Sequence, residues 1–161
     1  MTDSPLAPLD IELGRMLAAL DPSRRLRFAR DVARKLRASQ AARIAAQKNP
    51  DGSAFAPRRK RDEPARDRRG RIKRRVAARA MFRKLRQARW LRAEATPDEA
   101  LVGFTAAAAR IAQVHQLGLR DRVSRKPGAP EVTYPERVLL GITPEEEQLV
   151  ITLAAALLAG G

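Results

Sequence analysis

The sequence lacks cysteine entirely and contains a single histidine, His115, in 161 residues. Without cysteine a chain forms no disulfide, offers no thiolate to a metal ion and has no cysteine nucleophile. A lone histidine also excludes the multi-histidine sets that hold catalytic zinc. Only carboxylate sites are left open by composition, and neither the turn at Asp51 nor the acidic run 145–147 has the spacing of a metal site. We therefore predict no metal and no cofactor.

Long apolar runs are also missing. The most apolar stretch, residues 149–159, is only about half as long as the roughly 20 residues that a membrane-spanning helix needs. The amino-terminal residues have neither the basic start nor the apolar core of a signal peptide. We therefore expect no membrane span and no export by that route.

Catalytic and phosphate-binding patterns are absent as well. The glycines fit neither a phosphate loop nor a dinucleotide-binding loop. His115 has no recognisable nucleophile or acid partner in the sequence, so we expect a packing or hydrogen-bonding histidine at a helix end and not a general base. The sequence predicts that the protein is not an enzyme.

Positive charge is abundant and regional. The chain has 33 Lys and Arg against 18 Asp and Glu, a net charge of +15, and residues 24–92 alone hold 26 basic and 5 acidic residues. Segment 58–75 is a basic loop with almost no large apolar residue, so it cannot fold by burying side chains. Such a loop fits two partners, the phosphates of a nucleic acid or the acidic surface of another protein. No aromatic residue lies between Phe55 and Phe82 to stack on single-stranded bases.

Apolar periodicity and capping residues predict the elements. We expect one domain over 1–161 that combines helices and strands in an α+β fold. The predicted helices are 9–20, 22–48, 76–87, 106–117 and 143–159, the last opened by a capping box at Thr143. The predicted strands are 90–95 and 100–105, which form a hairpin, and 131–134. We expect a turn at 49–52, a polar loop over 120–130, and a buried helical turn or tight connection over 137–141.

Several strings, in order, resemble the phage virion morphogenesis family, whose members include tail completion proteins of contractile-tailed phages. The strings begin with Leu36-Arg-Ala-Ser-Gln40, Arg43-Ile44 and Gln47, then Pro50-Asp51-Gly52 through Phe55-Ala-Pro-Arg58. They continue with Met81-Phe82-Arg-Lys-Leu85-Arg86, Val102-Gly-Phe-Thr105, Arg110-Ile-Ala112 with Val114-His-Gln116 and Gly118, and Tyr134-Pro135 with Arg137 and Leu139-Leu-Gly141. The chain departs from the family at Leu117, where an aromatic residue is expected, and at Phe55, where tyrosine is common.

The resemblance implies a structural protein of the tail end or neck, which completes the tail and helps to join it to the DNA-filled head. By looser similarity to other neck and tail-completion proteins, it implies a long N-terminal helix or helix pair packed on a small, mostly antiparallel sheet, and a homo-oligomeric ring, hexameric like the tail. Its partners would be other phage neck and tail proteins, with non-specific contact with passing DNA. The protein would then lie in the virion and, during assembly, in the host cytoplasm. The alternative that the residues alone leave open is a basic nucleic-acid-binding protein that uses segment 58–75.

Two sets of residues carry these expectations. The candidate interface set is acidic at one position and otherwise basic: Asp51, Arg58, Arg59, Lys60, Arg61, Arg68, Arg69, Arg71, Lys73, Arg74 and Arg75. The second set is expected to maintain the fold: His115, Gly118, Tyr134, Arg137 and Leu139.

Overall fold

The computed structural model describes residues 7–58, 80–124 and 126–159. Helices and short antiparallel strands are combined in an α+β fold, as predicted. In chain order the elements are α1 (Ala7–Ala18), α2 (Pro22–Ala45), β1 (Leu91–Ala95), β2 (Ala100–Phe104), α3 (Ala106–Gln116), β3 (Arg120–Arg122), β4 (Glu131–Thr133) and α4 (Pro144–Ala159).

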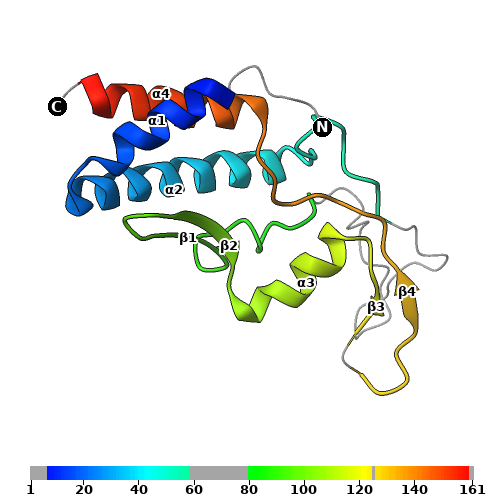
Figure 1. Cartoon of the computed structure of the whole chain (residues 1–161). Coiled ribbons are helices and arrows are strands. Elements are labelled where there is room, and N and C mark those ends of the chain that lie inside the picture. The colour runs from blue at the N-terminus through cyan, green and yellow to red at the C-terminus, as the bar shows by residue number, and fades with distance from the viewer. Residues whose placement is uncertain (1–6, 59–79, 125, 160–161) are drawn as a thin grey trace.

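The longest helix, α2, lies between two layers (Figure 1). On one side lie α1 and α4, and on the other lies the hairpin of β1 and β2. Asp21 caps α2 by accepting a hydrogen bond from the Arg24 N–H at 3.2 Å, and Pro22 occupies the first turn, as the sequence indicated. The buried face of α2 consists of Ala29, Val32, Ala33, Leu36, Gln40 and Ile44.

The strands form two separate two-stranded antiparallel sheets instead of one. The β1–β2 hairpin was predicted, and its register pairs Leu91 with Phe104 and Ala95 with Ala100. The second sheet pairs β3 with β4, and this short hairpin projects beyond the end of α3 (Figure 1).

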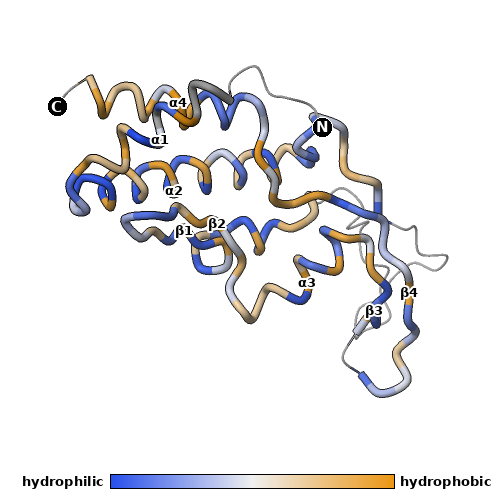
Figure 2. The backbone as a smooth tube through the Cα atoms, in the orientation of Figure 1, coloured by the Kyte–Doolittle hydropathy of each residue, from blue (hydrophilic) through white to orange (hydrophobic). Residues whose placement is uncertain are grey.

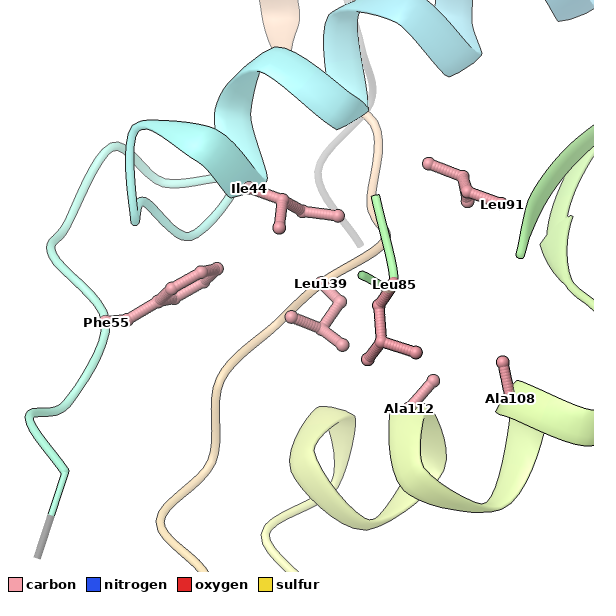
Figure 3. Packing of buried hydrophobic residues seen from close by; sticks show 7 residues of the cluster. All are labelled: Ile44, Phe55, Leu85, Leu91, Ala108, Ala112 and Leu139. Atoms are coloured by element: carbon pink, nitrogen blue, oxygen red, sulfur yellow. The ribbon is translucent and has the colours of Figure 1, made fainter. Parts of the chain in front are cut away.

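The core is a small cluster drawn from distant parts of the chain (Figure 3). Helices α2 and α3, strand β1 and three segments without regular structure supply its members: Ile44, Phe55, Leu85, Leu91, Ala108, Ala112 and Leu139. Ile44, Leu91 and Leu139 are fully buried. Because so few large side chains are enclosed, each one accounts for a large share of the apolar area removed from water.

The C-terminal helix α4 begins with the predicted capping box. The Thr143 N–H donates to Glu146 Oε2 at 3.1 Å, and the Glu146 N–H donates to Thr143 Oγ1 at 3.2 Å. Beyond this acidic first turn, Figure 2 shows apolar residues along most of α4, where it lies beside α1 and α2. No helix in the described ranges is both long enough and apolar enough to span a membrane.

The prediction of a helix over 76–87 is wrong for the residues that the structure describes. Residues 81–90 form a series of turns, and Phe82 has a φ of +61°. The segment makes only isolated turn bonds within itself, such as the Arg86 N–H to the Phe82 carbonyl at 3.2 Å, and the side chain of Gln47 bonds both the N–H and the C=O of Met81. Tertiary hydrogen bonds thus override the helical periodicity.

Two smaller expectations need correction. The polar loop predicted over 120–130 contains strand β3. Of the two alternatives expected for 137–141, the structure has the connection and not the helical turn. Helix α3 buries Ala108, Ala112 and Val114, whereas Ile111 is 51% exposed. Helix α2 ends at Ala45, a few residues before the predicted end at Lys48.

Candidate protein-protein interaction site

A buried arginine, Arg137, ties the segment that follows α2 to the end of α3. Arg137 is 3% exposed. Its Nε donates to the Ala56 carbonyl at 2.8 Å and its Nη2 to the Pro57 carbonyl at 3.0 Å, while its backbone N–H donates to the His115 carbonyl at 2.7 Å. Burial, and secondarily the like charge of Arg58, lowers the pKa of the Arg137 guanidinium. Backbone carbonyl oxygens therefore accept hydrogen bonds from both the Nε and the Nη2 of this buried guanidinium.

His115 lies between two aromatic rings and Arg137. Its ring centroid is 4.9 Å from that of Phe82 and 4.9 Å from that of Tyr134, both in edge-on geometry. Its Nδ1 lies 3.2 Å from Arg137 Nη1, and because a guanidinium only donates, Nδ1 is the acceptor and the proton sits on Nε2. Burial, and then the Arg137 charge, lowers the pKa of His115 to about 4. His115 is thus a neutral, packed imidazole at pH 7.

Gly118 lets the chain reverse after α3. Its φ is +61°, and a Cβ there would lie 3.2 Å from the Glu136 nitrogen and 3.3 Å from the Tyr134 oxygen. The reversal allows the Tyr134 N–H to donate to the Leu119 carbonyl at 3.1 Å. A side chain at this position meets both a left-handed backbone and a close neighbouring backbone, so glycine is required.

Gln116 holds the segment that leads to α4. Its Oε1 accepts from the Leu139 N–H at 2.8 Å and from the Leu140 N–H at 3.0 Å, and its Nε2 donates to the Leu140 carbonyl at 2.9 Å. These bonds replace the strand ladder that residues 137–141 lack. Leu139 is thereby directed into the core, where it is fully buried.

Both ends of the segment 59–79, which lies outside the described residues, are anchored close together. At one end Arg137 holds the carbonyls of Ala56 and Pro57. At the other end Gln47 accepts from the Met81 N–H at 2.6 Å and donates to the Met81 carbonyl at 3.1 Å. The rings of Phe55 and Phe82 join the two ends, with centroids 5.7 Å apart in edge-to-face geometry.

The predicted interface residues divide into two groups. Asp51 is exposed in the turn after α2, and its Oδ1 accepts from the Ser53 N–H at 2.9 Å and the Ser53 hydroxyl at 2.6 Å, which lowers its pKa. Asp51 also lines a shallow depression with Asn49, Pro50, Glu136 and Val138. Arg58 is exposed at the end of a described range. The others lie outside the described residues: Arg59, Lys60, Arg61, Arg68, Arg69, Arg71, Lys73, Arg74 and Arg75.

Four further polar side chains hydrogen-bond to main chain as Arg137 does, although no structural role was predicted for them: Gln47, Gln116, Asn49 and Arg43. Asn49 Oδ1 accepts from the Val138 N–H at 2.9 Å, and Arg43 Nη2 donates to the Gly141 carbonyl at 2.9 Å. Three of them stand in the strings that resemble the family. Arg43 lies in α2 and Gln47 just beyond its end, at the three- and four-residue steps that continue from Gln40 on the buried face, and this spacing is the signal that could have identified them.

Arg137 and these four side chains together form a brace for the backbone of the irregular segments. The donors and acceptors of the brace are directed at main-chain groups, and His115 Nδ1 accepts a hydrogen bond from Arg137. Within the ranges that the structure describes, no group of three or more His, Cys, Asp or Glu side chains is placed to hold a metal ion. What the brace does is fix the two ends of the most basic segment of the chain.

Comparison with known proteins agrees with this picture. Residues 6–159 match the model of the phage virion morphogenesis family. The chain is 40% identical over 136 residues to the tail completion protein S of Escherichia phage P2. The aligned region covers 84% of this chain and 85% of that protein. No solved structure matches. The family match over nearly the whole chain and the 40% identity to a member of that kind show that the chain belongs to the phage virion morphogenesis family.

Proposed function

We propose that this protein is a structural component of a phage tail, which completes the tail and helps to join it to the head through contacts in a ring of copies. The observation that carries the proposal is the 40% identity, over 84% of the chain, to a tail completion protein. In this role the chain binds other proteins and catalyses no reaction. It would be carried in the virion after assembly in the host cytoplasm.

The brace supports a role in holding the basic segment 58–75 for contact with other proteins. Arg137 and Gln47 hold Pro57 and Met81, which flank segment 59–79, and the rings of Phe55 and Phe82 bring these two flanks together. Segment 58–75 carries most of the candidate interface set. We propose that it binds acidic surfaces of neighbouring neck and tail proteins, because opposite charges on two surfaces favour association and set its orientation.

Deleting the gene from the phage or prophage that carries it tests the proposed role. We expect DNA-filled heads beside separate or overlong tails in electron micrographs, and joined particles again when the wild-type gene is supplied in trans. Normal joined particles without the protein would contradict the proposal.

Charge removal tests the proposed surface. Arg68, Arg69 and Arg71 changed together to glutamine should lower the yield of joined particles. The matched control changes Arg83, Lys84 and Arg86, which are exposed and lie on the described turns, to glutamine and should leave that yield unchanged. Equal yields from both variants would contradict a role for the basic segment in assembly.

A further inference from the structure

We propose that a second copy of this chain adds to the free edge of β1, in an antiparallel β1–β1 contact centred on Ala93 that places Arg92 of each copy opposite Glu94 of the other. This inference goes beyond the proposed ring: a two-fold contact joins copies in pairs, and it is separate from the head-to-tail contacts that close a ring. It names the surface and the register by which two copies recognise each other.

The hydrogen-bond pattern of the hairpin shows which backbone groups are directed to that edge. The Thr105 N–H donates to the Trp90 carbonyl at 2.9 Å, and the Thr96 N–H donates to the Glu99 carbonyl at 2.9 Å. In an antiparallel ladder, hydrogen-bonded and non-hydrogen-bonded pairs alternate. Even-numbered residues of β1 therefore direct their N–H and C=O groups to β2.

Ala93 and Ala95 consequently direct their backbone groups away from β2. Sheet pairing gives β1 the single neighbour β2 among the described strands, and the backbone hydrogen bonds outside the ladder include none from either alanine. Leu91 is different, because its N–H donates to the Gln87 carbonyl at 2.9 Å. The open part of the edge is thus short and centred on Ala93.

Side chains on the two faces of β1 suit a symmetric partner. Leu91 is fully buried and Ala93 and Ala95 are half-buried on one face, whereas Arg92 and Glu94 are exposed on the other. Neither charge forms an ion pair with another described residue, since the salt bridges in the described ranges do not include them. Opposite them on β2 lie the uncharged Gly103 and Leu101. Within the described part of the chain, both charges of β1 are therefore available to a partner.

A two-fold axis through Ala93 makes these charges complementary. Ala93 of each copy then exchanges hydrogen bonds with Ala93 of the other, and Arg92 and Glu94 fall on non-hydrogen-bonded pairs, where facing Cα atoms lie only about 4.5 Å apart. Opposite charges at such positions favour pairing and like charges oppose it. The apolar faces of the two hairpins lie on the same side of the sheet, whose order becomes β2-β1-β1-β2. Three or more strands also make a sheet more stable than an isolated pair.

The other edge of the hairpin offers no such selection. Strand β2 has the sequence Ala-Leu-Val-Gly-Phe, without a charge, so no charged pair would fix the register of a strand added there. Pairing at that edge is the competing outcome, and charge variants of β1 distinguish the two.

A charge-swap experiment on the full chain tests the contact by sedimentation equilibrium. Arg92→Glu and Glu94→Arg each turn both cross-strand pairs into like charges, and each alone should weaken self-association by about thirtyfold. Mixing the two variants in equal amounts restores opposite charges in both pairs, so the mixture should associate within about threefold of wild type. The double variant Arg92→Glu with Glu94→Arg should do the same.

Matched controls exclude effects of net charge and of folding. Lys84→Glu and Glu147→Arg make the same charge changes at exposed positions elsewhere and should associate as wild type does. Ala93→Pro removes an N–H that makes no bond within the hairpin, and it should abolish association while circular dichroism shows the same helix content. Single charge variants that associate as wild type, a mixture no tighter than its components, or a wild-type chain that stays monomeric would each overturn the proposal.

The proposed function can fail separately. If the single charge variants weaken association, the double variant restores it, and the phage lacking this gene still yields joined particles, the pairing stands and the tail role is wrong. If gene deletion leaves heads and tails apart but the charge swap has no effect on association, the tail role stands and this contact is wrong.

Discussion

Two parts of the molecule are attached to α2 in different ways. The irregular segments 49–58, 80–90 and 134–143 are held by side chains that hydrogen-bond to main chain, from Arg137, Gln116, Gln47 and Asn49. Helix α4 lies against α1 and α2 with a largely apolar sequence, and its polar contacts gather at its first turn. The difference follows from backbone chemistry.

A helix satisfies its own N–H and C=O groups, so apolar contact is enough to hold it in place. A segment without regular structure has no ladder, and its buried main-chain groups need partners from elsewhere. The motif residues of this chain are those partners. We therefore expect large losses of stability when a bracing side chain is removed, and small ones when a cap of α4 is removed.

Arg137→Leu should have the largest effect. It leaves the carbonyls of Ala56 and Pro57 without their donor and His115 Nδ1 without its partner, so we expect the free energy of unfolding to fall by about 3–5 kcal/mol. Urea denaturation followed by circular dichroism measures it. Arg137→Lys keeps the charge but not the fork of donors and should lose an intermediate amount. A loss below about 1 kcal/mol would show that the brace is not needed for stability.

Gly118→Ala should cost about 2 kcal/mol, because a Cβ at a φ of +61° would lie 3.2 Å from the Glu136 nitrogen. The matched control is Gly14→Ala in α1, where nothing lies within 4 Å of the added Cβ. Alanine in a helix is favoured over glycine, so that variant should be neutral or slightly more stable. Similar losses in both variants would contradict the argument from backbone strain.

His115 makes the brace sensitive to acid. Its pKa is about 4 in the folded chain, against about 6.5 for an unperturbed imidazole. Above about pH 6.5 both states are neutral and the stability is complete; as the pH falls toward 4, only the unfolded chain binds the proton, so stability is lost. Because the ring is half-buried, we expect a loss of about 1–2 kcal/mol from this group.

Comparison with His115→Gln isolates that contribution, because the carboxylates titrate in both proteins. The stability advantage of wild type over the variant should shrink between about pH 7 and pH 4.5 in urea denaturation. An advantage that does not change with pH would show that His115 titrates with an ordinary pKa.

Thr143→Ala should have the smallest effect. It removes the Oγ1 acceptor of the Glu146 N–H, and loss of such a cap costs about 1 kcal/mol. Thr143→Ser keeps the acceptor and should retain most of the stability. A loss as large as that of Arg137→Leu would mean that α4 depends on its polar contacts as strongly as the irregular segments do.

Much of the secondary structure could be read from local pattern. Helix α2 follows from Asp21, Pro22 and its apolar spacing, α4 from its capping box, and the β1–β2 hairpin from β-favouring residues on both sides of a turn. Strand β3 could not be read in this way. Its Arg-Asp-Arg sequence is polar, and its charges find partners only across the hairpin and on α3: Arg120 and Arg122 pair with Glu131, and Asp121 pairs with Arg110.

In the site, too, the sequence predicted some of the residues, whereas their partners were decided by the tertiary structure. Resemblance to the family singled out His115, Gly118, Tyr134, Arg137 and Leu139, but not the carbonyls that Arg137 binds or the role of Gln116 and Gln47. Those partners are separated by tens of residues along the chain, such as Arg137 and Ala56, and no local rule links them.

Composition and periodicity were thus sufficient for the α+β class, the main helices, one hairpin and the concentration of charge, because each depends on residues within a few positions of one another. Packing alone decided that 81–90 would form turns, that two small sheets would replace one, and that the ends of the basic segment would be anchored together. Those outcomes depend on which distant side chain reaches each unpaired main-chain group, and that choice exists only once the chain has folded.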